Sequence, residues 1–281
     1  MPELTNPRAE RVRSVRALAG RSVRERRGRF LVEGPQSVRE LTRFRAGHVD
    51  EVFLTDDAAT RYPEILAASR AAGLPVRTGT REVLDAMSDD AQGVLAVARV
   101  WEASATALPD RVRLVAVLAT VRDPGNAGTV IRVADAAGAD AVVLAGRSVD
   151  LFNPKVVRST AGSLFHLPVL KAPDLETALT MLRAAGCAVL AADGAGSHDL
   201  DDLLDRCHPR RSGTRNEPVA GVPDLAAPTA WLFGNEAHGL SDAERAMADV
   251  AVRVPLHGAA ESLNLATAAA VCLYASARAH R

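Results

Sequence analysis

Three polar turns carry the side chains of this 281-residue chain that could do chemistry. The turns span residues 122–132, 234–240 and 254–266, and their candidate side chains are Asn126, Arg132, Asn235, Glu236, Ser262 and Asn264. The set offers amides, one arginine and one carboxylate, without a nucleophilic cysteine, a lysine or a Ser-His-Asp order. Such an inventory favours the positioning of a substrate and the stabilisation of charge over covalent catalysis.

Each of these turns follows or adjoins a predicted buried strand. The run Leu114–Ala119 is almost wholly apolar, as expected of a strand buried on both faces of a parallel sheet. Similar strands are predicted at 141–144, 167–170, 188–192, 230–233 and 250–254, and helices at 127–138, 154–162, 174–185 and 262–279. The alternation predicts an α/β fold, a parallel sheet with helices on both faces. Such sheets bind ligands at the carboxyl ends of their strands, where the three turns lie.

The turn residues also have ordinary structural explanations. Asn126 and Ser262 are predicted N-caps of the helices that follow them. Gly234 could end a strand, and Glu236 could cap the next turn. Arg132 lies in a helix predicted to be largely buried, so its guanidinium needs a designated partner.

The N-terminal hundred residues predict a smaller α/β unit. A helix is expected to begin at Asn6-Pro7, followed by a basic loop over 21–29. Short strands are predicted at 30–32, 52–54, 74–76 and 94–100, with helices at 35–45, 61–72 and 80–87. Residues 101–111 lack an apolar period and predict a linker. Residues 206–229 predict a long mobile surface loop.

The net charge of the chain is zero, but the charge is unevenly distributed. Residues 1–45 contain 12 Arg and 5 Glu, a local balance of +7. A basic arm on a neutral protein is typical of a surface that contacts phosphates, although a solvated helix face could give much of the same pattern.

Other classes of protein are disfavoured. The cysteines Cys187, Cys207 and Cys272 are odd in number and contain no close pair, which argues against a disulfide framework and a Cys-x-x-Cys site. His198, Cys207 and His208 do not have the spacing of a standard metal site, so no metal is expected. No apolar run reaches the length of a membrane helix, and the N-terminus lacks the apolar core of a signal peptide, which favours a cytoplasmic protein.

The three turns together resemble the signature motifs of the SpoU (TrmH-like) family of RNA ribose methyltransferases, in the SPOUT class. The matching residues are Asn126, Gly128 and Arg132, then Gly234, Asn235, Glu236 and Gly239, then Pro255, Ser262, Leu263 and Asn264. Residues 153–162 also resemble a family segment, whereas 88–93 match only in part. The likeness covers 112–281 well, and the first 100 residues more loosely resemble a ribosomal-protein-like RNA-binding domain.

The resemblance implies properties that periodicity could not show. It implies a C-terminal trefoil knot, S-adenosylmethionine as methyl donor, and a homodimer whose active site draws on both subunits. It implies domains at 1–103 for RNA binding and 112–281 for catalysis, joined by a linker at 104–111. The implied activity is 2′-O-methylation of RNA ribose, with large-subunit ribosomal RNA preferred and transfer RNA as the alternative.

The resemblance also assigns roles to individual residues. Arg132 would stabilise the developing 2′-alkoxide, because a guanidinium does not readily give up its proton. The other expected catalytic or positioning residues are Asn126, Glu236, Ser262 and Asn264. Expected donor-binding residues are Gly194, Phe233, Gly234, Asn235, Val254, Pro255, Leu256 and Leu263, with Gly234 leaving room for the donor. Expected RNA-binding residues are Arg21, Arg24, Arg26, Arg27, Arg29 and Arg158.

Two other classes compete with this interpretation. Gly194-Ala195-Gly196 could belong to a dinucleotide-binding loop, but the third glycine is missing and the segment lies late in the chain. Tight NAD binding without S-adenosylmethionine binding would favour that class. A non-catalytic RNA-binding or assembly factor would also suit the basic arm, and an assay of methyl transfer to bulk RNA distinguishes it.

Overall fold

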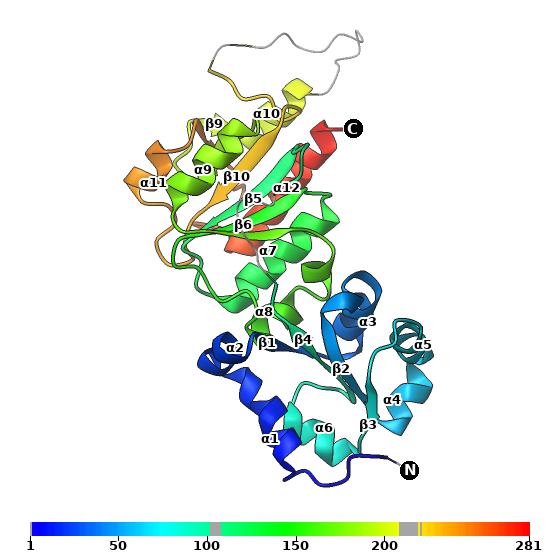
Figure 1. The fold of residues 1–281 in the computed structure, drawn as a ribbon. Coiled ribbons are helices and arrows are strands. Elements are labelled where there is room, and N and C mark those ends of the chain that lie inside the picture. Colours follow the sequence, from blue (N-terminus) through cyan, green and yellow to red (C-terminus); the bar gives the residue numbers. More distant parts are fainter. Residues whose placement is uncertain (1, 102–107, 208–218, 220) are drawn as a thin grey trace. The chain divides into compact units, whose positions relative to one another are not determined.

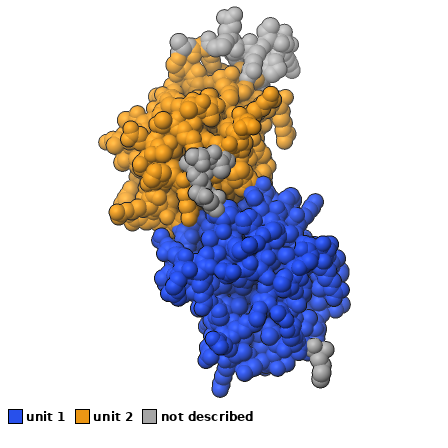
Figure 2. Space-filling view, in the orientation of Figure 1, with its two compact units in different colours: residues 1–102, 150–166 blue, residues 103–149, 167–281 orange. Residues whose placement is uncertain are grey.

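The computed structural model describes residues 2–101, 108–207, 219 and 221–281, and Figure 1 shows its ribbon. The chain forms two compact units, coloured separately in Figure 2. Unit 1 comprises Met1–Glu102 and Asp150–His166, and unit 2 comprises Ala103–Val149 and Leu167–Arg281. Among the described residues, no helix is both long enough and apolar enough to cross a membrane.

Unit 1 contains a four-stranded mixed sheet in the order β1-β4-β2-β3. Strands β1 (Arg29–Glu33) and β2 (Val49–Leu54) pair antiparallel with β4 (Val94–Arg99), and β3 (Val76–Thr78) pairs parallel with β2. The helices of its first part are α1 (Glu10–Arg16), η1 (Ala17–Ala19), α2 (Arg21–Arg27), α3 (Pro35–Phe44), η2 (Ala46–His48), α4 (Asp56–Arg61), α5 (Pro63–Ala71) and α6 (Arg81–Met87).

The core of unit 1 follows from apolar spacing. Val12 and Val15 on α1 and Met87 on α6 pack against side chains from the sheet, including Phe53 and Leu95. The period of α1 places its valines on one side of the helix, which leaves its arginines largely on the others.

Unit 1 also takes in a segment that comes between two strands of unit 2. This segment contains α8 (Pro154–Ser159) and η4 (Ser163–Phe165). Val156 and Val157 are fully buried, and the ring of Phe152 lies 4.6 Å from that of Phe30 on β1. The predicted domains were 1–103 and 112–281, which places residues 150–166 in the second domain. In the structure these residues belong to unit 1, because they contribute apolar side chains to its core.

Unit 2 contains a seven-stranded sheet in the order β7-β6-β5-β10-β8-β11-β9, in which every neighbouring pair is parallel. Its strands are β5 (Leu114–Ala119), β6 (Ala141–Ala145), β7 (Val169–Ala172), β8 (Ala188–Ala192), β9 (His198–Asp199), β10 (Thr229–Phe233) and β11 (Val250–Arg253). Its helices are α7 (Pro124–Ala136), α9 (Leu175–Ala184), α10 (Leu200–Cys207), α11 (Asp242–Ala246) and α12 (Leu265–Ala279).

Helices cover both faces of this sheet. Alternate side chains of the strands, such as Val117 and Leu232, share one core with Leu179 of α9. On the opposite face, the Trp231 indole Nε1 of β10 donates a hydrogen bond of 2.9 Å to Ser276 Oγ of α12. The predicted parallel α/β sheet with helices on both faces is confirmed.

Several local predictions need correction. Helix α1 begins at Glu10, because Asn6 Oδ1 instead accepts from the N–H of Arg8 and closes a turn. Residues 21–27 form helix α2 rather than a loop, ended by Gly28 in the left-handed conformation at φ 61°. The single helix predicted at 61–72 is interrupted, since Pro63 starts a second helix.

Two predicted helix caps were also wrong. Asp123, not Asn126, caps α7, and its side chain accepts from the N–H of Asn126. Asn264, not Ser262, caps α12. Helix α10 was not predicted, and its last two residues fall in the predicted 206–229 loop. Residues 208–218 and 220 of that loop lie outside the described residues, as do residues 102–107 of the linker region.

Candidate active site

The three polar turns meet through a chain of side-chain contacts in unit 2. Glu236 Oε1 accepts from the N–H of Asp123 at 3.3 Å and lies 3.5 Å from the amide nitrogen of Asn126. Asn126 Oδ1 accepts from the amide nitrogen of Asn264 at 3.1 Å. Residues that are 110 and 138 positions apart thus form one Glu236–Asn126–Asn264 network.

The cap of α12 fixes the orientation of Asn264 within this network. Its Oδ1 accepts from the N–H groups of Ala266 at 2.9 Å and Thr267 at 3.4 Å. Since the oxygen is occupied by the cap, the amide NH₂ of Asn264 faces Asn126. The cap that stabilises the helix also orders the polar turn.

The middle turn has a tight backbone. Asn235 and Gly239 exchange backbone hydrogen bonds of 3.0 and 2.8 Å, and the Asn235 amide donates to the carbonyl of Thr120 at 3.0 Å. A Cβ on Gly234 would lie 2.3 Å from the carbonyl carbon of Gly239. Gly234 is therefore required by the return of its own turn, whereas its expected role in leaving room for the donor stays a prediction.

Gly234→Ala is expected to disrupt this turn, because the backbone it would strike cannot move aside like a flexible side chain. We expect a loss of about 1–3 kcal/mol in unfolding free energy and of donor binding. Gly47→Ala, in unit 1, is the matched control, since a Cβ at that position meets nothing within 4 Å. Thermal melts and calorimetric titration of the donor measure both effects. Wild-type values for Gly234→Ala would contradict this account of the turn.

Arg132 lies on α7 six residues after Asn126 and is exposed, although its neighbours Val130 and Ile131 are fully buried. Among the described residues, no hydrogen bond or ion pair engages its guanidinium. The expectation of a buried guanidinium with a designated partner was wrong, because Arg132 lies on the solvent side of the helix. Ser262 is also exposed and does not join the network.

The predicted donor-binding residues follow three neighbouring strands. Gly194 comes after β8, Gly234 after β10, and Val254 after β11, and these strands are adjacent and parallel. Gly194 is exposed in open space, and Leu256 is 40% exposed despite its apolar side chain. The side chain of Phe233 is buried, so only its backbone can face a ligand. Both polar atoms of the Asn235 side chain have partners, since its amide nitrogen donates to the carbonyl of Thr120 and its Oδ1 accepts from the N–H of Ala237.

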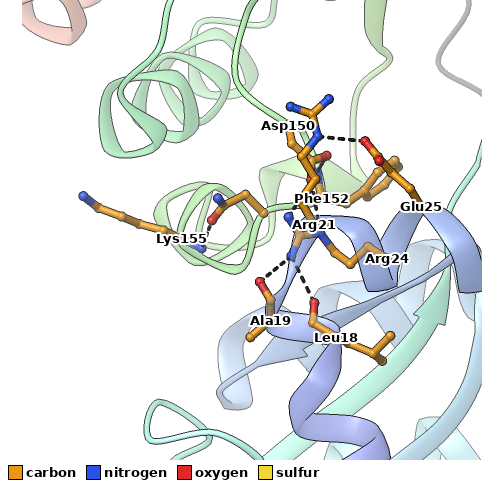
Figure 3. Close-up of polar contacts among 9 residues, drawn as sticks. Leu18, Ala19, Arg21, Arg24, Glu25, Asp150, Phe152 and Lys155 are labelled. Atoms are coloured by element: carbon orange, nitrogen blue, oxygen red, sulfur yellow. Dashed lines mark hydrogen bonds and ion pairs between the residues drawn. The ribbon is translucent and has the colours of Figure 1, made fainter.

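The predicted RNA-binding arginines lie in unit 1 and differ in exposure: one is buried, four are exposed, and Arg158 is half-buried. Arg24 is buried, and its guanidinium contacts Asp150 at 2.6 Å and the carbonyls of Leu18 and Ala19 at 3.0 and 2.6 Å (Figure 3). Arg24 is therefore a structural residue and is not available to phosphate, which corrects the prediction. The exposed members of the set are Arg21, Arg26, Arg27 and Arg29.

Most of the exposed arginines have intramolecular partners. Arg21 pairs with Glu25 at 2.7 Å, and Arg29 pairs with Asp50 at 2.5 Å. Arg158 contacts both Glu33 at 2.7 Å and Asp90 at 2.5 Å. Arg158 would have to leave two carboxylates to bind a phosphate.

Two residues of the site escaped the sequence argument. Thr120, with φ 54°, supplies the carbonyl that holds Asn235, and no sequence signal marks that conformation. Asp123 caps α7 and presents its N–H to Glu236. The pair Asp123-Pro124 is a standard helix start and could have identified this cap.

The cysteines are poorly suited to nucleophilic chemistry. Burial, with a contribution from Asp140, raises the pKa of Cys187 to about 11, and burial raises that of Cys272 to about 12. The described residues also contain no cluster of His, Cys, Asp and Glu that could hold a metal ion.

The native protein should resist alkylation at Cys187 and Cys272 at pH 8, because only about one thiol in a thousand or fewer is ionised three units below its pKa. Peptide mapping after iodoacetamide treatment tests this. Unfolded protein, in which all three cysteines should react, is the control. Rapid labelling of Cys272 in the native state would contradict its burial.

Comparison with known proteins covers both parts of the chain. Residues 113–274 match the model of the SpoU rRNA Methylase family, and residues 31–100 match that of the RNA 2′-O ribose methyltransferase substrate-binding domain. Over 277 residues the chain is 32% identical to the 23S rRNA (guanosine(2553)-2′-O)-methyltransferase RlmP of Bacillus subtilis, with 98% of each protein covered.

Solved structures show the same similarity. An rRNA methyltransferase from Sinorhizobium meliloti with bound AdoMet superposes with a TM-score of 0.78 at 28% identity, covering 98% of this chain and 97% of the other. AviRb from Streptomyces viridochromogenes, in complex with AdoMet, superposes with a TM-score of 0.77 at 31% identity, covering 96% of this chain and 98% of the other. The chain therefore belongs to the SpoU rRNA Methylase family.

Proposed function

We propose that this protein transfers a methyl group from S-adenosylmethionine to a ribose 2′-hydroxyl of large-subunit ribosomal RNA. The observation that carries the proposal is the Glu236–Asn126–Asn264 network, which joins three turns in a chain with an exposed arginine on the same helix as Asn126. Relatives named as 23S rRNA 2′-O-methyltransferases support this substrate. The direct test is transfer of labelled methyl from the donor to purified ribosomal RNA, with recovery of the label on ribose.

The residues after β8, β10 and β11 fit the donor. Leu256 and the half-buried Val254, Pro255 and Leu263 provide apolar groups that an adenine ring can contact. The exposed backbone at Gly194 provides hydrogen-bonding groups for the polar part of the molecule. When bound, S-adenosylmethionine supplies an electrophilic methyl group on a sulfonium.

Arg132 would stabilise the charge that develops on the ribose oxygen. A guanidinium does not give up its proton in proteins, so Arg132 would act electrostatically and not as a general base. The 2′-hydroxyl proton would leave to an RNA phosphate or to water. The guanidinium of Arg132 has no intramolecular partner among the described residues, so it is free to contact the RNA. A buried guanidinium with a partner, as expected from the sequence, would have been less accessible to the RNA.

The Glu236–Asn126–Asn264 network would position the ribose near Arg132. Glu236 accepts from the amide of Asn126, which sets the orientation of that amide. Ser262 is exposed two residues before the helix cap, and its hydroxyl would contribute to this catalytic site.

Substitutions at Asn264 should separate the two roles of this residue. Asn264→Ala removes the cap of α12 and should cost about 1 kcal/mol of stability as well as activity. Asn264→Asp retains an oxygen for the cap but loses the donor to Asn126, so it should keep stability and lose activity. Denaturation curves and methyl-transfer rates provide the comparison. Equal activity of Asn264→Asp and wild type would contradict the positioning role.

The RNA would approach unit 1 through exposed arginines. We retain Arg21, Arg26, Arg27 and Arg29 as phosphate contacts and Arg158 as a residue that would exchange its carboxylate partners for RNA. The match of residues 31–100 to a substrate-binding model supports RNA binding by this unit, while the named arginines lie outside the matched range. We also propose that 1–103 bind RNA and 112–281 perform catalysis, with 150–166 folding as part of the first unit.

The trefoil knot and the homodimer are further parts of the proposal. A Cβ on Gly196 would lie 2.7 Å from the backbone of Val252 and Arg253, so the chain passes very closely there, as a threaded segment would. On α12, Val271 is 39% exposed and Tyr274 51%, and they line a cavity of about 490 Å³ that a second copy could cover. Sedimentation at micromolar concentration tests the dimer. We also propose a cytoplasmic location, which the proposed action on ribosomal RNA supports.

A further inference from the structure

Phe44 is the one large hydrophobic side chain of unit 1 that is exposed among the described residues, at 49%. It is the last residue of α3. The other large apolar side chains of this unit that face its core, such as Phe30 and Phe53, are fully buried. A lone exposed ring is ordinary, so its surroundings decide what it can do.

Cationic and aromatic groups surround this ring. The guanidinium carbon of Arg43 lies 5.1 Å from the Phe44 ring centroid, within the range of a cation–π contact. The His166 ring packs against Phe44 with centroids 4.6 Å apart and planes tilted by 58°. Glu40, one turn earlier on α3, lies 3.2 Å from His166 and holds the imidazole in place.

The same end of unit 1 carries further positive charge. The guanidinium carbon of Arg45 lies 5.8 Å from the ring centroid of Trp101, and Arg99 pairs with Asp50 at 3.3 Å. The pKa of His48 is lowered, first by burial and then by the charges of Arg45 and Arg99. Arg43 and Arg45, on either side of Phe44 in the chain, thus carry positive charge, while Asp50 pairs with Arg99 and Glu40 lies beside His166.

We propose that Phe44, with Arg43, Arg45 and His166, forms a stacking platform for an unpaired RNA base. These four residues are named the Phe44 platform, and the inference rests on the proposed function because it assigns RNA as the ligand. An unpaired base offers a π-face to the ring, and its phosphates offer the negative charge that the two arginines complement. A duplex hides its base faces and would use only the charges.

The platform is separate from the arginines predicted to bind RNA, none of which belongs to it. It therefore predicts that the substrate has an unpaired nucleotide in addition to the methylated one, as a loop or bulge provides. The predicted RNA-binding arginines alone could not indicate an unpaired nucleotide, because contacts to phosphate do not distinguish paired from unpaired RNA.

The test is binding of the full chain to a twelve-nucleotide oligoadenylate and to an RNA duplex of the same length. Phe44→Ala should weaken binding to oligoadenylate on the order of tenfold and leave duplex binding within about twofold. Phe44→Trp and Phe44→Tyr should restore binding, since both retain a ring. Arg43→Gln should weaken the binding of both RNAs. Arg70 is an exposed arginine on α5, and Arg70→Gln is the matched control for the loss of one charge.

Equal affinity of wild type and Phe44→Ala for oligoadenylate would overturn the platform. An equal loss of affinity for oligoadenylate and duplex in Phe44→Ala would also overturn it, as would wild-type affinity that neither Phe44→Trp nor Phe44→Tyr retains. Phe44-dependent binding of oligoglutamate in place of oligoadenylate would assign the surface to an acidic peptide instead. These measurements need no methyl donor. They can therefore succeed or fail independently of methyl transfer, on which the proposed function depends.

Discussion

Arg132→Ala is expected to reduce the maximal rate of methyl transfer on the order of 100- to 1000-fold. The reason is that Arg132 would supply preorganised positive charge to the developing ribose alkoxide. With alanine in its place, only solvent would stabilise the negative charge of the alkoxide. Donor affinity should stay within about twofold, because the predicted donor loops follow β8, β10 and β11, whereas Arg132 lies on α7. Single-turnover assays at saturating RNA, with calorimetric titration of the donor, separate the two quantities.

Arg132→Lys should recover only part of the rate, since an ammonium keeps the charge but loses the planar fork of the guanidinium. Arg70→Ala, in unit 1, should match wild type and controls for loss of an exposed arginine. A near-wild-type rate for Arg132→Ala with unchanged donor binding would remove Arg132 from the catalytic role.

The second large effect is expected on stability rather than on rate. Arg24→Met should destabilise unit 1 by about 3–5 kcal/mol, because it leaves the largely buried Asp150 carboxylate without its cation (Figure 3). The side chain of Arg24 is only 3% exposed and that of Asp150 only 16%. Chemical denaturation, with hydrogen exchange measured in α2 and α8, should locate the loss in unit 1.

Two comparisons make this prediction specific. Arg21→Met breaks an exposed pair with Glu25 and should cost less than about 1 kcal/mol. The double variant Arg24→Met/Asp150→Leu should regain part of the stability, because no buried charge is then left unpaired. An Arg24→Met protein as stable as wild type would show that the buried pair contributes nothing to unit 1.

The central strands of unit 2 could be predicted because burial on both faces makes them apolar runs, whereas the short edge strand β9, which consists of His198 and Asp199, was not predicted. β5 at Leu114–Ala119 and β8 at Ala188–Ala192 have the predicted bounds. The caps were harder to assign, because Asp123 and Asn126 are both good cap residues and only the backbone decides between them. The meeting of the three turns followed from the rule that carboxyl ends of parallel strands share one edge.

Long-range side-chain pairing could not be predicted in the same way. Nothing in the local pattern of Arg24 shows that its partner Asp150 lies 126 positions later, so a cluster of arginines looked uniformly exposed. The exposure of Arg132 was missed for a related reason. Apolar neighbours show that a helix is buried, but they do not show which of its sides remains open to solvent.

The central claim is ribose methylation of large-subunit ribosomal RNA, and the most direct measurement is a map of 2′-O-methyl groups in RNA from cells with and without this protein. We expect that one mark on large-subunit RNA disappears without the protein, returns with the wild-type chain, and fails to return with Arg132→Ala. A mark lost only from transfer RNA, or a ribose methylation map that does not change, would contradict it.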